Sequence, residues 1–253
     1  LQYPDTEINL FCREYLKNLI SENYSYNVNK IKSNNNGCLF INGRLLISSP
    51  ISVSGEEEIG VKDNSIVYAR LLRKNCLSIT PKKFLDPGFI NEIKKKIKVK
   101  RVNARLVQYP WDLIHINKEQ ITSDFTSYIK VESIRENKYK GVHLINDSQI
   151  FTGKNTVIKP GCVLDSENGP IYIGHNVKIS SNSVIEGPAF IGDNVVIQPL
   201  SRIRAGSNIG RVCKIGGEIM NTIIQDYSNK QHDGFLGDSY LGSWVNLGAG
   251  TVN

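Results

Sequence analysis

Isoleucine recurs at every sixth position through much of the second half of this chain. The series runs without a miss through eight residues: Ile173, Ile179, Ile185, Ile191, Ile197, Ile203, Ile209 and Ile215. A period of six matches neither an α-helix, which repeats near 3.6 residues, nor an alternating strand, which repeats every two. It suits a coil of short flat strands with a sharp turn after each, in which every sixth side chain points inward. We therefore assign these isoleucines to a core and not to a functional site.

The residues between the isoleucines favour tight turns. Glycine, asparagine and aspartate recur there, as in Gly174-His175-Asn176 and Gly192-Asp193-Asn194, and they tolerate the backbone conformations that such turns need. Three six-residue segments make one triangular turn, and stacked turns pair strand to strand at about 4.8 Å. The pattern resembles the hexapeptide-repeat left-handed parallel β-helix, an exception to the right-handed crossover rule. We expect this coil over residues 141–253 and beyond Asn253, because the last residues carry no polar cap.

The six-residue period breaks between Thr222 and Phe235. This segment is polar and contains Lys230 and His232. We interpret it as an insertion that projects from the coil, and projecting loops often carry functional residues.

Residues 1–120 show no such period and read as a mixed domain. Apolar residues with helical spacing predict helices over residues 10–21 and 87–97, and runs of strand-forming residues cover 38–47, 65–72 and 102–107. The mixture predicts an α/β domain. It begins at Leu1 and not at Met, so we expect this domain to be partial. Residues 121–140 should link it to the coil, within or after a helix over residues 117–131.

Composition excludes several classes of protein. With 40% hydrophobic and 22% charged residues, and no apolar run near the roughly 20 residues that a bilayer span needs, neither a disordered nor a membrane protein is expected. Five scattered cysteines with no C-x-x-C pair favour free thiols in a reducing cytoplasm over disulfides or a zinc site. His115, His143 and His175 stand alone without ligand spacing, so we predict no metal site.

The net charge of +7 belongs to the first half of the chain. Residues 1–140 hold 23 Lys and Arg against 15 Asp and Glu, whereas residues 141–253 hold 8 against 9. The densest basic run, residues 94–101, has two readings: a site for nucleic acid or a nucleotide phosphate, or a solvated helix end followed by a strand. The second reading is favoured, because no aromatic residues interleave to stack bases.

Two motifs point to a family. The segment from Asn229 to Thr251 contains His232, Gly234-Phe235-Leu236-Gly237-Asp238 and Val245-Asn246-Leu247-Gly248-Ala249-Gly250. It resembles the acetyltransferase domain of the family of bifunctional N-acetylglucosamine-1-phosphate uridyltransferases/glucosamine-1-phosphate acetyltransferases. The whole chain is similar to a bacterial group of sugar nucleotidyltransferases of that superfamily, which share Asn42-Gly43-Arg44-Leu45 and Tyr109-Pro110-Trp111-Asp112-Leu113. The resemblance implies a nucleotidyltransferase-like α/β domain followed by a left-handed β-helix.

The resemblance also implies site residues. His232 falls on the family's general base for the sugar amine, a role that suits a neutral imidazole. Arg204 falls on the arginine that grips the sugar phosphate, and it should point outward because it follows inward Ile203. Asn246 falls near the acceptor site and Ala249 on a backbone contact to acetyl-CoA, while Lys230 is grouped with the substrate-binding residues.

Three departures from the family pattern stand against this assignment. Phe235 replaces a tyrosine, which removes a hydroxyl, and Asn221 replaces a phosphate-binding lysine, which removes a charge. No glycine-rich phosphate loop of the nucleotidyltransferases occurs in this sequence, so either the loop lies upstream of Leu1 or the nucleotidyl activity is absent.

Two classes of function therefore remain open. One is an enzyme that acts on a sugar phosphate or nucleotide sugar, by nucleotidyl transfer from an NTP with Mg²⁺ or by acyl transfer from acetyl-CoA or another acyl-CoA. The other is a non-catalytic trimeric scaffold or sugar-nucleotide sensor. A cytoplasmic homotrimer is expected in both, without membrane or nucleic-acid partners. The sequence names neither the sugar, the nucleotide nor the acyl group.

Overall fold

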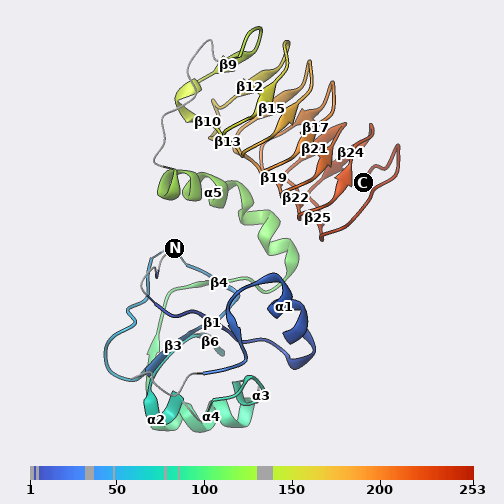
Figure 1. Ribbon diagram of the computed structural model, residues 1–253. Coiled ribbons are helices and arrows are strands. Elements are labelled where there is room, and N and C mark those ends of the chain that lie inside the picture. Colours follow the sequence, from blue (N-terminus) through green and yellow to red (C-terminus); the bar gives the residue numbers. More distant parts are fainter. Residues whose placement is uncertain are drawn as a thin grey trace. The chain divides into compact units, whose positions relative to one another are not determined.

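The computed structural model divides the chain into two compact units, Leu1–Gln108 and Tyr109–Asn253. It describes residues 3, 6–31, 37–47, 49–76, 79–84, 86–129 and 139–253. These two parts of the chain are called unit 1 and unit 2 (Figure 1). None of the helices in the described ranges has the length and hydrophobicity that crossing a bilayer requires.

Unit 1 is built on a four-stranded sheet in the order β3-β6-β5-β7, in which β5 and β7 are parallel and the other pairs antiparallel. Its strands are β3 (Gly37–Ile41), β5 (Glu58–Lys62), β6 (Ser65–Leu72) and β7 (Lys98–Arg101). Two small sheets accompany it: β1 (Asn9–Leu10) with β2 (Asn27–Val28), and β4 (Leu45–Leu46) with β8 (Arg105–Leu106). The helices are η1 (Glu14–Leu16), α1 (Lys17–Asn23), α2 (Arg73–Cys76), α3 (Pro81–Phe84) and α4 (Pro87–Lys96).

The sheet, helix α2 and helix α4 contribute to one apolar core. Ile59, Ala69, Leu71 and Ile97 are buried in it. Asp86 begins α4 by accepting a hydrogen bond from Gly88 N, and Pro87 stands at its first turn. The basic run of residues 94–101 thus forms the end of α4 and strand β7, the helix-then-strand arrangement that the sequence favours.

One pair of cysteines corrects the expectation of free thiols. Cys38 and Cys76 form a disulfide, with Cα atoms 6.1 Å apart, while Cys12, Cys162 and Cys213 are free. Strand β6 runs antiparallel to β3, pairing Leu72 with Gly37, and α2 follows β6 directly. This turn of the chain brings residue 76 back to residue 38. The two cysteines are 38 residues apart in the sequence, so no local spacing predicts that they form a disulfide.

Unit 2 is a left-handed parallel β-helix, as the period of six predicts. Its strands stack in three faces, and every ladder pair is parallel. Face 1 holds β9 (His143–Ile145), β12 (Val163–Asp165), β15 (Val184–Glu186), β18 (Arg202–Ile203), β21 (Glu218–Met220) and β24 (Phe235–Gly237). Face 2 holds β10 (Ile150–Thr152), β13 (Ile171–Ile173), β16 (Ala189–Ile191), β19 (Ser207–Ile209), β22 (Ile223–Ile224) and β25 (Tyr240–Leu241). Face 3 holds β11 (Val157–Ile158), β14 (Lys178–Ile179), β17 (Val196–Ile197), β20 (Lys214–Ile215) and β23 (Asn229–Lys230), and a short helix, η2, covers Asp147–Gln149.

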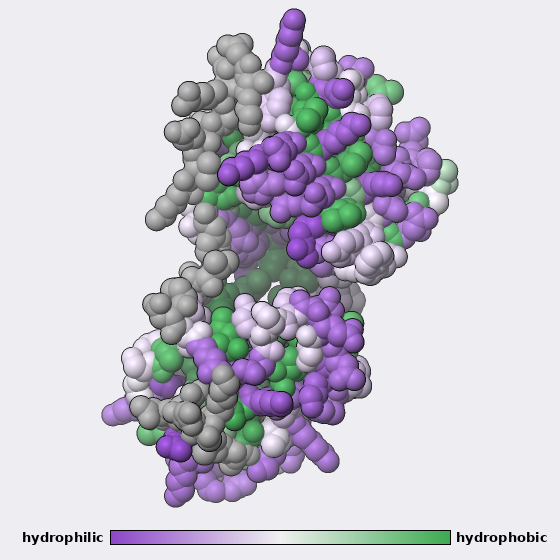
Figure 2. Space-filling view, viewed as in Figure 1, coloured by the Kyte–Doolittle hydropathy of each residue, from purple (hydrophilic) through white to green (hydrophobic). Residues whose placement is uncertain are grey.

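All eight isoleucines of the sixfold series are buried at 0% exposure inside this coil. Each stacks on its counterpart in the next coil, as Ile179 does on Ile197 and Ile197 on Ile215. Hydrophilic side chains cover much of the outer surface of the coil in the view of Figure 2. Alternate residues of a strand point to opposite sides of it, so the positions between the inward residues are left for the outer surface.

Two kinds of residue stabilise the corners of the coil. Asn155, Asn176 and Asn194 occupy one corner with positive φ, a conformation that asparagine tolerates better than most residues. Small buried hydroxyls satisfy corner carbonyls: Ser183 Oγ donates to Ser180 O at 2.9 Å, and Ser201 Oγ donates to Gln198 O at 2.6 Å. Buried carbonyls without such donors would destabilise the fold.

The sixfold period ends because later coils are shorter, not because of an insertion. Ile203 pairs with Ile219 after 16 residues and Ile215 with Lys230 after 15, whereas the coils directly before them contain 18 residues. Residues 222–235 contain β22, β23 and the start of β24, all within the parallel ladder. The expectation of a projecting insertion is therefore wrong. Missing residues at the corners shift the inward positions off the count of six.

The shortest corner consists of two glycines. Gly217 adopts φ +73°, and a Cβ on Gly216 would lie 2.2 Å from Gln231 O of the next coil. Only glycine fits a corner in which successive coils approach so closely.

Helix α5 (Pro110–Tyr128) belongs to unit 2. It begins at Pro110, and Asp112 Oδ2 accepts a hydrogen bond from Tyr109 N. Buried Asn117 then fixes the helix to the coil, because its Nδ2 donates to Gly206 O at 2.6 Å and its Oδ1 accepts from Asn208 Nδ2 at 3.3 Å. The helix thus starts before the predicted linker of residues 121–140 and packs on the coil instead of serving only as a connection.

Candidate functional site

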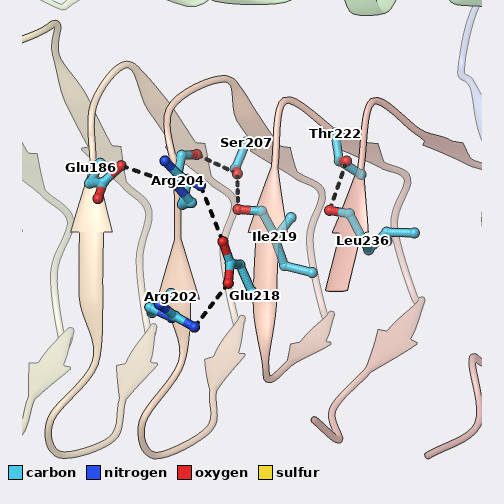
Figure 3. Close-up of polar contacts among 8 residues, drawn as sticks. All are labelled: Glu186, Arg202, Arg204, Ser207, Glu218, Ile219, Thr222 and Leu236. Atoms are coloured by element: carbon cyan, nitrogen blue, oxygen red, sulfur yellow. Dashed lines mark hydrogen bonds and ion pairs between the residues drawn. The ribbon is translucent and has the colours of Figure 1, made fainter. Parts of the chain in front are cut away.

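Arg204 lies on the outside of the coil, directly after β18. Its Nη1 is 3.2 Å from Glu218 Oε1, and its Nε is 3.7 Å from Glu186 Oε2 (Figure 3). Arg202 also contacts Glu218, at 3.0 Å. The two arginines and two glutamates form a row across β15, β18 and β21. A phosphate that approached Arg204 would compete with these carboxylates.

Face 1 ends beside Arg204 in a polar corner. Asn221 has φ 45° and donates a side-chain hydrogen bond to Asp238 Oδ1. Ser207 Oγ donates to Arg204 O at 2.6 Å, and Thr222 Oγ1 is 3.4 Å from Leu236 O (Figure 3). The position where the family pattern expects a phosphate-binding lysine thus holds an amide already paired with a carboxylate.

His232 lies at the opposite end of face 1, in the corner that precedes β24. Its side chain is exposed, and its Nε2 is 3.5 Å from Gln231 Nε2. Arg204 instead follows β18, which lies two turns before β24 on the same face, so the two residues occupy different corners in different turns of the β-helix. Within one chain, the structure does not bring this histidine and this arginine together.

Lys230 is buried inside the coil, with 1% of its surface exposed. It stands in the inward stack of face 3 directly after Ile215. Its Nζ donates to Gly216 O at 3.2 Å and to His232 O. Burial lowers the pKa of this amine, against an opposing effect of the Asp233 charge. The predicted substrate-binding lysine therefore directs its amine into the interior.

The remaining predicted residues lie near the last turn of the described chain. Asn246 is exposed and forms a parallel bridge with Asn229, and Ala249 is exposed two residues beyond Leu247. Phe235 is half-buried on face 1, and its ring lies over Gly237. Asn246 and His232 therefore lie in successive coils, and Gly250 N, next to Ala249, donates to Asp233 O, next to His232, at 3.2 Å.

A second candidate site lies within unit 1. A cavity of about 720 Å³ opens among Phe11, Phe40, Asn42, Ser65, Pro87 and Asn91. Three cations line it: Arg13, Arg44 and Lys94. Among the described residues that line it, none is an aspartate or glutamate. A cavity of this size and charge suits a phosphorylated ligand of nucleotide or sugar-nucleotide size.

Local structure fixes the cations of this cavity. Asn42 turns the chain between β3 and β4, because its Oδ1 accepts from Arg44 N at 3.0 Å and its Nδ2 donates to Ile66 O at 2.7 Å. Arg44 Nη1 donates to Gln108 Oε1 at 2.7 Å, which leaves other guanidinium donors for a ligand. Sequence reasoning noted Asn42-Gly43-Arg44-Leu45 and the basic run that holds Lys94, but it missed Arg13 and the cavity that unites them.

A separate polar cluster of unit 1 lies outside this cavity lining. Tyr68 Oη donates to Glu58 Oε1 at 2.6 Å, and Arg70 Nη1 lies 3.3 Å from the same oxygen. Burial, followed by the hydrogen bond to Glu58, raises the pKa of Tyr68 to about 12. The hydrogen bond from Tyr68 lowers the pKa of Glu58. Because all three groups satisfy one another, we assign them a structural role.

The donor groups for a Mg²⁺ ion do not gather in either candidate site. No group of three or more His, Cys, Asp or Glu side chains arranged for a metal occurs in the described part of the chain. Mg²⁺ is usually held by one or two carboxylates together with substrate phosphates, and the described residues that line the cavity of unit 1 include none. We therefore derive no step through a metal ion.

Comparisons with known proteins place the chain among sugar nucleotidyl transferases, and the matching region includes unit 1 and helix α5. Residues 1–132 match the family described as "Sugar nucleotidyl transferase". Three relatives carry the name bifunctional protein GlmU. That of Rippkaea orientalis is 29% identical over 181 residues, or 70% of this chain and 38% of the relative. Those of Cyanothece sp. and Ruthia magnifica are 34% identical over 143 residues and 33% identical over 113 residues, covering 54% and 44% of this chain and 28% and 24% of the relatives. The chain thus spans well under half the length of these relatives.

Proposed function

Because the chain belongs to the sugar nucleotidyl transferase family, we propose that unit 1 transfers a nucleotidyl group between a nucleoside triphosphate and a sugar phosphate. The observation that carries this proposal is the cavity lined by Arg13, Arg44 and Lys94, whose described lining contains no carboxylate. An oxygen of the sugar phosphate attacks the α-phosphorus, the bond from that phosphorus to the β-phosphate's bridging oxygen breaks, and pyrophosphate leaves. The three cations hold the phosphates and stabilise the charge that develops on them.

Neighbouring lysines on α4 offer a test of this proposal. Lys94 lines the cavity, whereas Lys95 is exposed and does not. The change Lys94→Met should weaken binding of UDP-N-acetylglucosamine, measured by calorimetry, by about tenfold, because one phosphate contact is lost. Lys95→Met removes the same charge from the same helix and should leave the affinity unchanged. Equal losses in both variants would leave only a general attraction of the basic surface for anions.

For unit 2 we propose acyl transfer from acetyl-CoA to the amine of an amino-sugar phosphate. The amine nitrogen attacks the thioester carbonyl carbon, the C–S bond breaks, and CoA leaves as the thiol after His232 accepts the amine proton and returns it to sulfur. Support comes from the exposed His232 and from Asn246 in the next coil. Release of free CoA, followed with a thiol reagent in the presence of glucosamine 1-phosphate, tests this activity. No release above the rate without enzyme, over a panel of amino-sugar phosphates, contradicts it.

A homotrimer is part of the same proposal. Arg204 and His232 occupy different corners of one β-helix, two turns apart, so a site that uses both would draw them from two copies of the chain. A triangular coil presents three flat faces and can bury one against its neighbours. Light scattering at micromolar concentration should give three times the mass of one chain, and a monomer would remove the shared site.

One observation favours the non-catalytic alternative for unit 2. Arg204 is already paired with Glu186 and Glu218, so its charge is balanced without a phosphate. A trimeric scaffold needs neither a free arginine nor a base. If the chain released no CoA with any acceptor while it still assembled as a trimer, the scaffold would be the better description.

A cytoplasmic location remains a proposal. It loses the support of free thiols at Cys38 and Cys76, because these two residues form a disulfide.

A further inference from the structure

Buried polar side chains of the coil follow one rule. Apart from one residue, those of the described strands and corners of the coil are all hydroxyls: Thr156, Ser166, Ser183, Ser201, Ser207, Thr222 and Ser228. Each donates to at least one corner carbonyl, as Thr156 Oγ1 does to Gly174 O at 2.7 Å and Ser228 Oγ to Gly242 O at 2.9 Å. A hydroxyl fits the narrow corner and satisfies a carbonyl that water cannot reach. The exception is Lys230.

Lys230 takes over the task of a missing corner serine. At the corner between faces 3 and 1, Ser201 Oγ donates to Gln198 O, the carbonyl directly after inward Ile197. The next coil is two residues shorter at this corner and has no serine there. Its corresponding carbonyl, Gly216 O, directly follows inward Ile215 and accepts from Lys230 Nζ at 3.2 Å instead. A long side chain from the following coil therefore replaces a short one from the same coil.

The same amine makes a second bond that a serine could not make. Lys230 Nζ also donates to His232 O, so it ties the corner that carries His232 to the glycine corner of the preceding coil. A methionine or leucine would fill the inward position of Lys230 equally well, without the cost of burying an ammonium group. The amine is thus explained by the carbonyls that it joins and not by packing.

We propose that Lys230 is a positioning residue that acts from inside the coil, holding the backbone of His232 so that its imidazole projects from a fixed corner. Its catalytic consequence rests on the proposed acyl transfer, whereas its structural consequence does not. The amine takes no part in substrate binding. It sets the geometry of a corner in which the exposed imidazole has few packing contacts to hold it.

The first test measures the corner itself, in the full chain. Lys230→Met keeps the length of the side chain and removes the donor, and Ile215→Met repacks the same inward stack one coil earlier without removing a donor. Hydrogen exchange followed by mass spectrometry should show the amides of residues 231–235 exchanging about tenfold faster in Lys230→Met, with residues 180–183 unchanged. Ile215→Met should leave both segments unchanged. Equal protection of residues 231–235 in wild type and Lys230→Met would overturn the proposal.

The second test asks where the amine is. Lys214 lies on the outer side of the neighbouring strand β20 and is exposed. In the native protein, acetic anhydride should modify Lys230 at least about a hundredfold more slowly than Lys214, because modification requires the corner to open. Rates within a few-fold of each other would place the amine in solvent and return Lys230 to the substrate-binding residues.

The third test separates positioning from mere stability. With acetyl-CoA and glucosamine 1-phosphate, Lys230→Met should lower kcat by about tenfold or more while KM changes less than about twofold, because the base is misplaced and the substrate contacts remain. Ile215→Met, assayed below both melting temperatures, should retain the wild-type kcat. An unchanged kcat in Lys230→Met overturns the catalytic consequence. If the wild type has no turnover, the proposed acyl transfer fails, and the exchange and labelling experiments still decide the role of Lys230.

Discussion

The coils before residue 210 and the coils after it have the same fold, but different residues occupy the inward stack of face 3 and one of the corners. In the earlier coils the face 3 stack is aliphatic, from Ile158 through Ile197, and one corner repeats asparagine at positive φ. In the later coils Lys230 replaces an isoleucine, and the same corner holds Val212, Tyr227 and Trp244, also at positive φ.

The difference identifies the residues of the later coils that depart from the pattern of the earlier ones. A valine, tyrosine or tryptophan at positive φ is strained, whereas asparagine tolerates it. Tyr227 and Trp244 stack with ring centroids 4.6 Å apart, which offsets part of that strain. Leu200, at another corner of the earlier coils, also has φ 61°, so such strain is not confined to the later coils, in which Lys230 and the three bulky corner residues replace isoleucine and asparagine. The predicted site residues His232 and Asn246 lie in these same coils.

The largest expected effect belongs to the earlier coils. Ile197→Asp places a charge at a position with no exposure and no partner and should lower the free energy of unfolding by about 4 kcal/mol or more. Gln198→Asp, at the next and half-exposed position, should change it by about 0.5 kcal/mol or less. Urea titrations of both variants give the comparison. Similar losses at the two positions would be incompatible with an inward residue 197.

A second pair contrasts histidines of the two regions. His232→Ala should lower acyl transfer by roughly 10² to 10⁴-fold and leave the melting temperature nearly unchanged, because a positioned base contributes about that much to the rate. His175 of the earlier coils accepts a hydrogen bond from Lys154 N at 2.8 Å. His175→Ala should instead cost about 1 kcal/mol of stability and leave turnover unchanged. The reverse pattern would remove His232 from the reaction.

Arg204 lies just before the boundary between the two regions, and the expected effect of replacing it is smaller. Arg204→Ala should raise KM for the sugar phosphate by about tenfold with kcat largely preserved, because a phosphate contact acts in ground and transition states alike. Stability should change by no more than about 1 kcal/mol, since its ion pairs are half-exposed. Glu218→Gln frees the guanidinium from one competitor and should lower KM. A KM that responds to neither change assigns Arg204 to the surface network alone.

The smallest effect tests the strain itself. Val212→Asn restores the residue of the earlier coils at a position that is 44% exposed, and it should stabilise the protein by about 0.5 to 1 kcal/mol. Asn194→Val, the reverse change one coil earlier, should destabilise it by a similar amount. Calorimetric melting of both variants provides the measurement. If Val212→Asn is neutral while Asn194→Val is costly, packing at residue 212 compensates for its backbone.

Sequence reasoning succeeded where the fold repeats and failed where contacts are unique. The inward isoleucines were predictable because one physical demand recurs at a fixed spacing. The break after Ile215 was misread as an insertion, since a loss of residues at Gly216-Gly217 and an added loop disturb a period in the same way. The burial of Lys230 was equally hidden, because it depends on a carbonyl that the shortened corner leaves unsatisfied.

The sequence of unit 1 contains fewer repeated patterns, so its candidate site was harder to predict. Strand β6 and helix α4 fell close to the predicted ranges, but the pairing of Cys38 with Cys76 depends on a turn of the chain that no spacing reveals. The cavity cations come from three separate segments. Arg13, Arg44 and Lys94 acquire their common meaning only when the sheet brings those segments together.

The glycine corner at residues 216–217 also bears on how such a chain can change over generations. Coils before and after it keep their pairing, with Ile209 still opposite Ile224 and Ile219 opposite Leu236. Each coil contacts only its neighbours, so a deletion of two residues is absorbed where it occurs and does not shift the frame of the rest. A lineage can thus reshape one corner by losing codons while it inherits the remaining coils intact.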